Sequence, residues 1–274
     1  MLNEITKILK QKYSPAEAQA LAGILISESA EMTIIQSMLS NRTLKDYPLI
    51  ISQIKRLLND EPIQYILGKT DFCNLTIHCD SRALIPRPET EELVQWILDE
   101  TPVDSSTRIL DIGTGTGCIA IALAANLPNA EITAVDISED ALSLASENIE
   151  NLNIDNVTLR HLDILNASKF EGKFDIIVSN PPYISEGEKR DMEHNVLDYE
   201  PHTALFPPGD DALMFYKSIS AFARQHLTGS LFLELNQYFH SEISSIVAGS
   251  GLSDIEIRND MFSKPRMLRA RNLK

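Results

Sequence analysis

Two segments of the chain combine residue types and spacings that suit the binding of a nucleotide-like cofactor and the holding of an amino group. The first is an apolar strand that runs into a turn with three glycines, Ile109-Leu110-Asp111-Ile112-Gly113-Thr114-Gly115-Thr116-Gly117, and a helix follows directly. Glycines let the backbone come close to a ligand, and the start of a helix offers N–H groups without intrahelical partners. We therefore expect the turn to bind a cofactor through Gly113, Thr114, Gly115, Thr116 and Gly117.

An acidic residue at the end of the next predicted strand narrows the choice of cofactor. Asp136 follows Ile132-Thr133-Ala134-Val135, about twenty residues beyond the glycines, where a carboxylate can accept hydrogen bonds from both hydroxyls of a ribose. This position fits a nicotinamide dinucleotide or S-adenosylmethionine. The glycine spacing is Gly-x-Gly-x-Gly rather than the Gly-x-Gly-x-x-Gly of dinucleotide sites, and it favours S-adenosylmethionine, which has no pyrophosphate to bind.

Two residues after the third predicted strand are candidates for contact with the adenine. In the run His161-Leu162-Asp163-Ile164, the Asp163 carboxylate is placed to reach the adenine amino group while Ile164 packs on the ring. The alternative is an aspartate in a solvated turn, which needs no ligand.

The second chemical segment is Asn180-Pro181-Pro182-Tyr183, which follows the fourth predicted strand. Ligands of open α/β sheets bind outside the carboxyl ends of the strands, so this loop should face the same crevice as the glycine turn. The prolines restrict the backbone, and the Asn180 side chain and the Pro181 carbonyl offer two acceptors that match the two hydrogens of an –NH₂ group. Tyr183 offers a flat face for the planar group that carries this nitrogen.

This arrangement suits methyl transfer to an amide or exocyclic amino nitrogen, which is a poor nucleophile because its lone pair is delocalised. Acceptors on both N–H bonds would hold the nitrogen in line with the S–CH₃ bond and stabilise the positive charge that develops on it. We predict Asn180, Pro181 and Tyr183 as catalytic, and the whole run from Asn180 to Tyr183, including Pro182, as the substrate-binding loop.

The elements that position these segments form an α/β arrangement after a helical N-terminus. Short apolar runs predict strands at residues 108–112, 131–135, 156–160, 174–179, 230–235, 255–258 and 266–270. Amphipathic patterns between them predict helices at 89–100, 118–126, 139–150, 212–227 and 237–248. Alternating strands and helices indicate a parallel sheet covered on both faces, hence a Rossmann-like domain over residues 87–274.

The region before this domain has a different pattern. Residues 1–70 predict a helical-bundle domain, with helices at the N-terminus, after the Ser14-Pro15-Ala16-Glu17 capping signal, and near residues 32–39 and 49–58. Residues 71–86 predict a β-hairpin linker, because apolar and polar residues alternate from Cys73 to Cys79 and Ala83-Leu84-Ile85 is placed to form the partner strand. We expect this helical domain to serve packing or the binding of a partner, as a substrate-docking domain, rather than to carry catalysis.

Composition and charge limit the class of protein. The chain has 274 residues, of which 43% are hydrophobic and 23% charged, and this ordinary usage excludes a collagen-like or wholly disordered chain. It carries 24 Lys and Arg against 39 Asp and Glu, and the net charge of −15 argues against direct binding of nucleic acid. Cys73, Cys79 and Cys118 match neither a disulfide framework nor a zinc pattern, so we expect no metal and a reducing compartment.

Hydropathy adds an expectation about location. The most apolar stretch, residues 109–127, is interrupted by Asp111 and three glycines, and the N-terminus has no apolar run of signal-peptide length. We therefore expect a cytoplasmic monomer that does not associate with membranes.

Further segments give the chain a resemblance to a known family. They are Glu61-Pro-Ile-Gln-Tyr-Ile-Leu-Gly68, Leu84-Ile-Pro-Arg-Pro-Glu-Thr-Glu91 and Asp198-Tyr-Glu-Pro201, together with the Asn-Pro-Pro-Tyr loop and the glycine turn. Together they resemble the glutamine methyltransferases of peptide chain release factors, often called PrmC or HemK, over nearly the whole chain. The resemblance implies transfer of a methyl group from S-adenosylmethionine to the glutamine of the Gly-Gly-Gln loop of a release factor, which modulates translation termination.

The resemblance also implies roles for particular residues. It places the cofactor against the glycine turn and Asp136, and it places Asn180 next to both cofactor and substrate. The segment Arg87, Pro88, Glu89 and Thr90 resembles the part of the family that lines the cofactor pocket, in a supporting role. Departures from the family pattern are Leu197 in place of a frequent arginine, the turn Pro207-Pro208-Gly209-Asp210-Asp211, and Asn236 in place of a usual glycine.

Two other functions remain open from the residues. An amino-methyltransferase acting on a base of DNA or RNA would use the same loop on a flipped base, but the negative charge and the absence of a separate basic domain argue against it. A non-catalytic binding protein derived from a methyltransferase would not need the intact glycines, Asp136 and Asn180.

Overall fold

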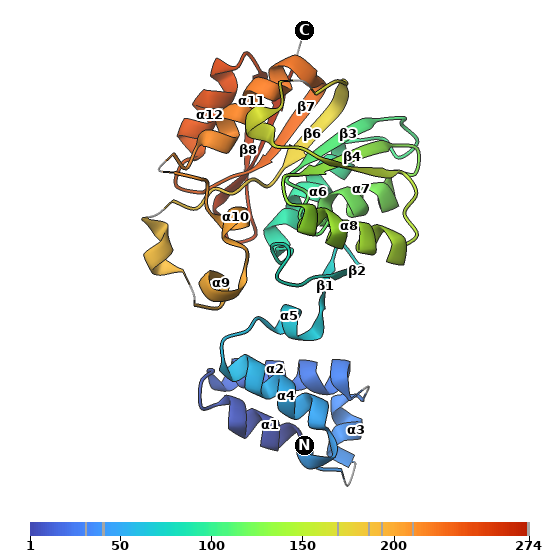
Figure 1. Cartoon of the computed structure of the whole chain (residues 1–274), viewed down its shortest axis with the longest axis vertical. Coiled ribbons are helices and arrows are strands. Elements are labelled where there is room, and N and C mark those ends of the chain that lie inside the picture. Colours follow the sequence, from blue (N-terminus) through green and yellow to red (C-terminus); the bar gives the residue numbers. More distant parts are fainter. Residues whose placement is uncertain are drawn as a thin grey trace. The chain divides into compact units, whose positions relative to one another are not determined.

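The computed structural model describes residues 1–274 except Glu31, Ser40, Asn41, Lys169, Glu186, Glu193, Asp210, Leu273 and Lys274, and it leaves out the side chains of Met38 and Asp191. The chain divides into two compact units (Figure 1). One unit comprises Met1–Gly68 with Glu193–Tyr199, and the other comprises Lys69–Met192 with Glu200–Lys274. Within the described part of the chain, none of the helices combines the length and apolar character needed to cross a bilayer.

The first unit is helical, as its periodicity predicts. Its helices are α1 (Leu2–Leu9), α2 (Pro15–Ser29), α3 (Ile34–Leu39), α4 (Pro48–Leu58), α5 (Ile63–Leu67) and α9 (His194–Tyr199), with a 3-10 turn at Leu44–Asp46. The Ser14 side chain accepts a hydrogen bond from the Glu17 N–H and so caps α2, as expected. Ile5, Leu9, Leu25 and Ile50 are fully buried in its core.

The hairpin that opens the second unit differs from the predicted one. Its strands are β1 (Lys69–Phe72) and β2 (Leu75–His78), which pair antiparallel. The prediction that Ala83-Leu84-Ile85 forms the partner strand is wrong, because those residues lie outside any strand. Cys73 and Asn74 have φ of 48° and 63°, and two consecutive left-handed residues form a tight hairpin turn that interrupts the apparent alternation from Cys73 onward.

The second unit is built on a seven-stranded sheet with the order β5-β4-β3-β6-β7-β9-β8. The strands are β3 (Arg108–Ile112), β4 (Glu131–Asp136), β5 (Val157–His161), β6 (Phe174–Ser179), β7 (Leu227–Glu234), β8 (Ser253–Asn259) and β9 (Pro265–Arg271). Neighbours from β5 through β7 pair parallel, whereas β9 is antiparallel to both of its neighbours. Each predicted strand of this sheet is present, with ends shifted by a few residues at most.

Helices cover both faces of this sheet (Figure 1). They are α6 (Pro88–Glu100), α7 (Cys118–Asn126), α8 (Glu139–Asn151), α11 (Met214–His226) and α12 (His240–Gly249), while the short helix α10 (His202–Leu205) lies at the cavity. Successive strand residues enter opposite cores: Ile109 packs in the cluster that contains α6 and α7, and Leu110 in the one that contains α11 and α12. This two-sided burial explains why the central strands are nearly continuous apolar runs. The predicted Rossmann-like fold is confirmed.

Candidate active site

The two chemical segments leave the sheet side by side. Ile112 is the last residue of β3 and Ser179 the last of β6, and these two residues are paired in the parallel ladder. The Ser179 hydroxyl donates to the Ile112 carbonyl at 2.7 Å. The strand order reverses between β3 and β6, and the crevice at such a point is where open α/β sheets bind their ligands. The glycine turn and the Asn-Pro-Pro-Tyr loop therefore start from adjacent positions, as predicted.

The glycine turn has a backbone shape that only glycines adopt at low cost. Gly113, Gly115 and Gly117 have φ of 74°, 56° and 81°. The N–H groups of Gly113 and Thr114 both donate to the Val135 carbonyl, at 2.8 and 3.0 Å, and tie the turn to β4. Gly117 is the N-cap of α7, and a Cβ there would lie 3.2 Å from the Cβ of Ala145. Close packing against α8 is the second reason for a glycine at position 117.

Asp111 was not among the predicted site residues, and it holds the glycine turn in place through a hydrogen bond. It is fully buried, and the Thr114 hydroxyl donates to its carboxylate at 2.6 Å. Burial raises the pKa of Asp111 to about 7. Its contact is with the turn, so its role is to hold the turn rather than to touch a ligand.

Asp136 lies at the edge of the crevice and also shapes it. One carboxylate oxygen accepts from the Gly115 N–H and the other from the Ser138 N–H, both at 2.9 Å. An ionised carboxylate has about four acceptor positions, so each oxygen retains capacity for another donor. Burial raises the pKa of Asp136, and the backbone N–H groups partly offset this rise. The position suits a ligand with two adjacent hydroxyls.

A cavity of about 460 Å³ joins these segments. Of the residues predicted for the site, those that line it are Gly113, Thr114, Gly115, Thr116, Asp136, Asp163, Ile164, Asn180, Pro181 and Pro182. Gly117 and Tyr183 are not among its described lining residues. Residues 82–87, 201–204 and 206 also line the cavity.

Asp163 has partners of its own within the chain. Its two carboxylate oxygens accept from the Leu165 N–H at 2.9 Å and from the Asn166 side-chain amide at 2.5 Å, and it caps the 3-10 turn Ile164–Asn166. A capping aspartate needs no ligand, so its predicted contact with adenine stays a prediction, although the residue does line the cavity.

The Asn-Pro-Pro-Tyr loop is held by a buried polar network. The Asn180 side-chain amide donates to the Thr90 hydroxyl at 3.2 Å, and Thr90 donates to the Glu234 carboxylate at 2.6 Å. The Tyr183 hydroxyl donates to the other oxygen of Glu234 at 3.0 Å. Burial raises the pKa of Glu234. Glu234 was not among the predicted site residues, because its partners lie on a helix and a loop far away in the sequence and no local pattern marks it.

One family departure also holds this loop. Asn236 stands where the family usually has glycine, and its side-chain amide donates to the Tyr183 carbonyl at 3.0 Å and to the Glu188 carboxylate. The departure therefore adds support to the loop. In the turn at residues 207–211, Asp210 lies outside the described residues.

Two further segments quoted for the family resemblance meet at the cavity wall. Arg87 forms a salt bridge with Glu200 at 2.5 Å, and the other oxygen of Glu200 accepts from the Ile85 N–H at 3.2 Å. Glu200 is only 3% exposed. This contact joins the Pro-Arg-Pro-Glu segment to the Asp-Tyr-Glu-Pro segment and gives both a structural role. Arg87 and Thr90 line the cavity, whereas the described lining does not include Pro88 or Glu89.

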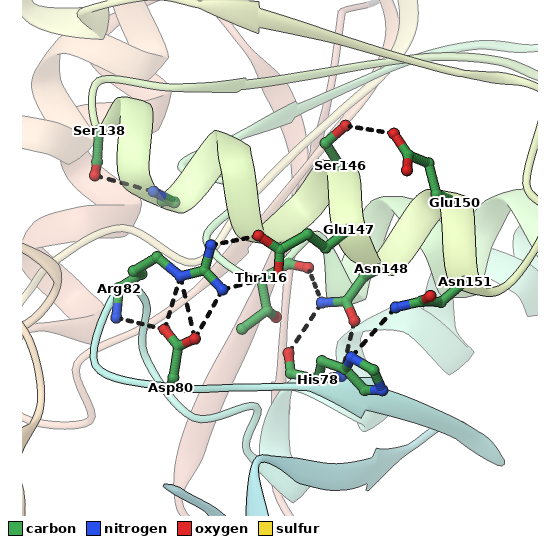
Figure 2. Close-up of polar contacts among 11 residues, drawn as sticks. His78, Asp80, Arg82, Thr116, Ser138, Ser146, Glu147, Asn148, Glu150 and Asn151 are labelled. Carbon is green, nitrogen blue, oxygen red and sulfur yellow. Dashed lines mark hydrogen bonds and ion pairs between the residues drawn. The ribbon is translucent and has the colours of Figure 1, made fainter.

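Polar contacts with α8 hold residues 78–82, the segment that leads into the cavity lining (Figure 2). The Asn148 amide donates to the carbonyls of His78 and Thr116, each at 2.9 Å, and its oxygen accepts from the His78 N–H at 2.7 Å. Arg82 binds Asp80 and Glu147. One buried asparagine thus connects β2, the glycine turn and α8.

The residues around the cavity fit S-adenosylmethionine. The glycine turn exposes its backbone to the cavity, and the adjacent start of α7 supplies N–H groups. Asp136 retains acceptor capacity suited to the hydroxyls of a ribose. The cavity is within the size range of sites for small organic ligands. No group of three or more His, Cys, Asp or Glu side chains in the described part of the chain is arranged to hold a metal ion.

Comparisons with known proteins agree with this geometry. Residues 90–219 match the methyltransferase small domain family. The chain is 41% identical to a release factor glutamine methyltransferase of Bacteroides thetaiotaomicron, an alignment that covers 98% of this chain and 99% of that protein. It is 43% identical to a protein of the same name from Flavobacterium psychrophilum, over 84% of this chain and 81% of that one. A solved methyltransferase from Pyrococcus furiosus shares the fold, with a TM-score of 0.53 and 22% identity over 80% of this chain and 98% of that one.

Proposed function

The chain belongs to the family of release factor glutamine methyltransferases, and from this premise we propose that it methylates the glutamine of the Gly-Gly-Gln motif in peptide chain release factors. The methyl group comes from S-adenosylmethionine and goes to the side-chain amide nitrogen. The modification modulates translation termination.

One observation supports this proposal above the others. Asn180 and Pro181 line the same cavity as the glycine turn and Asp136, and they follow the strand that is paired with the strand before that turn. An amide held by Asn180 and a cofactor held by the turn would therefore meet in one cavity. A binding module for a nucleotide would need the turn but would have no use for two acceptors placed beside it.

The residues of this chain bind the substrate amide and orient its nitrogen. The side-chain oxygen of Asn180 and the backbone carbonyl of Pro181 accept hydrogen bonds from the two N–H groups of the substrate amide, so the nitrogen is held rather than free to rotate. The same two oxygens stabilise positive charge on the nitrogen as its lone pair is drawn into bonding. When bound, S-adenosylmethionine supplies an activated methyl group. No strong base is needed before transfer, because the product nitrogen loses its proton readily to water.

Tyr183 has a structural contact in addition to its predicted one. Its hydroxyl is engaged with Glu234, and its ring packs against the core cluster that contains α11 and α12. We propose that it fixes the end of the loop, while contact between its ring and the substrate remains a prediction.

The helical unit contributes no described residue to the cavity lining and is the candidate docking domain for the protein substrate. It has a core of its own, and cavity-lining residues lie in the other unit. We propose that it docks the release factor, that the enzyme acts in the cytoplasm as a monomer, and that nucleic acid is not its substrate.

The test compares three substrates with one enzyme preparation. Purified enzyme is incubated with radiolabelled S-adenosylmethionine and either release factor, release factor with the Gly-Gly-Gln glutamine replaced by alanine, or duplex DNA. We expect label in the first sample alone, and mass spectrometry should place one added methyl group on the glutamine of that peptide. Label in DNA, or equal label in both factor samples, would overturn the proposal.

A further inference from the structure

We propose that Thr90 and Glu234 are positioning residues that aim the Asn180 carbonyl at the substrate amide. Glu234 is a single buried carboxylate that holds both ends of the Asn-Pro-Pro-Tyr loop, through Thr90 at Asn180 and directly at Tyr183. This inference rests on the proposed function, since it assigns a reason for the geometry of the same site.

The contacts form a short chain across three elements. Thr90 lies in the first turn of α6, Glu234 is the last residue of β7, and Asn180 follows β6. The distances along the chain are 3.2 Å from the Asn180 amide nitrogen to the Thr90 hydroxyl and 2.6 Å from that hydroxyl to Glu234. Glu234 is 2% exposed and Thr90 3%, so water competes little for these contacts.

The chemistry of the three groups determines which way the Asn180 amide points. With Glu234 ionised, its carboxylate only accepts hydrogen bonds, so the single hydroxyl hydrogen of Thr90 goes to Glu234, the direction of the 2.6 Å contact. The Thr90 oxygen can then only accept from Asn180, which must present its –NH₂ group to Thr90. The carbonyl oxygen of Asn180 is left on the other side, where it is available to accept from a substrate amide.

A second hydrogen bond to Glu234 holds the Tyr183 end of the Asn-Pro-Pro-Tyr loop. Tyr183 donates to the remaining oxygen of Glu234 at 3.0 Å. The two prolines between Asn180 and Tyr183 restrict the intervening backbone. A side-chain acceptor that is fixed before the substrate arrives loses little entropy on binding, and misplacement by about 1 Å can cost a hundredfold in rate.

Thr90→Val tests this inference most sharply, because valine keeps the branched shape but removes the hydroxyl. We expect kcat on the Gly-Gly-Gln peptide to fall by about tenfold to a hundredfold. The Asn180 side-chain amide loses its hydrogen-bond partner and becomes free to rotate. The affinity for S-adenosylmethionine should change by less than about twofold, a difference of under 1 kcal/mol. Thr90→Ser, which restores the hydroxyl, should recover most of kcat.

Thr101→Val is the matched control. Thr101 follows the same helix, is 6% exposed, and donates its hydroxyl to the Ile97 carbonyl at 2.7 Å, away from the cavity. It should lower thermal stability by removing a buried hydroxyl hydrogen bond, while leaving kcat unchanged. A fall in kcat that merely follows loss of stability would appear in both variants.

A double variant shows whether Thr90 acts through Asn180. If it does, adding Thr90→Val to Asn180→Ala should slow the enzyme no further than Asn180→Ala alone, because the amide to be oriented is already gone. Independent, multiplicative losses would overturn the inference, and so would a Thr90→Val enzyme with the kcat of wild type. Failure of the proposed function is distinguishable, since wild-type enzyme would then leave the Gly-Gly-Gln peptide unmodified.

Discussion

Gly115 donates its backbone N–H to the Asp136 carboxylate at 2.9 Å, so the residue expected to bind the ribose also holds the glycine turn against β4. The Ser138 N–H occupies the other oxygen. Two backbone N–H groups therefore fix the Asp136 carboxylate in place, and its side chain should not need to move when a ligand binds.

Asp136→Ala should weaken binding of S-adenosylmethionine by about 10- to 150-fold, because charge-assisted hydrogen bonds of this kind contribute about 1.5–3 kcal/mol. Isothermal calorimetry measures the change. An unaltered dissociation constant in a folded variant would show that Asp136 does not contact the ribose. Asp163→Ala in the same assay separates adenine contact from capping, since loss of a cap alone should leave the affinity unchanged.

The glycines of the turn should differ in their tolerance of alanine. Gly117→Ala places a Cβ 3.2 Å from Ala145 and Ile121 at a φ of 81°, whereas Gly113→Ala meets nothing within 4 Å at a φ of 74°. Both variants carry about 1–2 kcal/mol of left-handed strain. Only Gly117→Ala adds a packing conflict of about 1–3 kcal/mol. Urea unfolding without cofactor should rank Gly117→Ala as the less stable, and equal stabilities would contradict the packing role.

Buried Asp111 should make part of the stability depend on pH. Its pKa is raised from 3.8 to about 7, so the folded state holds the proton more tightly than the unfolded state does. The resulting stabilisation is complete below the unfolded pKa and is lost as pH rises through about 7, with a slope of up to about 1.4 kcal/mol per pH unit. The difference in unfolding free energy between wild type and Asp111→Asn should therefore fall from pH 5 to pH 7.

Chemical denaturation of both proteins across this range measures the difference directly. Arg82 lowers the pKa of Asp80 and of Glu147, which gives a slope of opposite sign at more acidic pH. Both acids are common to the two proteins, so their contributions cancel. A difference that stays flat or grows with pH would mean that Asp111 is ionised throughout the range.

The sheet and its flanking helices could be predicted because their signals are local. A buried strand such as β3 is a short apolar run, and α7 and α8 follow their strands after recognisable turn or capping residues. The glycine turn and the Asn-Pro-Pro-Tyr loop could be placed together because the carboxyl ends of parallel strands share one edge. The predicted partner strand at Ala83-Leu84-Ile85 failed because positive φ at Cys73 and Asn74 was not evident from their residue types alone.

The supporting contacts of the site could not be predicted, because they join residues far apart in the chain. Thr90 and Glu234 are 144 positions apart, and Arg87 and Glu200 are 113 apart. No periodicity or spacing reports such pairs. Short helices such as α5 and α10 were missed for a different reason, since they are too short to show a helical repeat.

An enzyme that begins at Lys69 should separate catalysis from docking. The second unit contains the cavity-lining residues and its own core, so the truncated enzyme should bind S-adenosylmethionine and methylate a short Gly-Gly-Gln peptide. Its kcat/KM on folded release factor should fall by about tenfold or more, equivalent to roughly 1.4 kcal/mol of lost binding. If a folded truncated enzyme modifies the intact factor at the full-length rate, the helical unit does not dock the substrate.

Asn180→Ala is the most direct test of the proposed methyl transfer, because it removes the side-chain acceptor and keeps the prolines and the glycine turn. The single-turnover rate is measured with saturating S-adenosylmethionine by mass spectrometry of the Gly-Gly-Gln peptide at timed intervals. We expect a loss of about a hundredfold or more, since one hydrogen bond to developing charge contributes about 3 kcal/mol to the transition state. Cofactor affinity should fall much less. A variant that retains most of the wild-type rate would show that Asn180 does not hold the substrate amide.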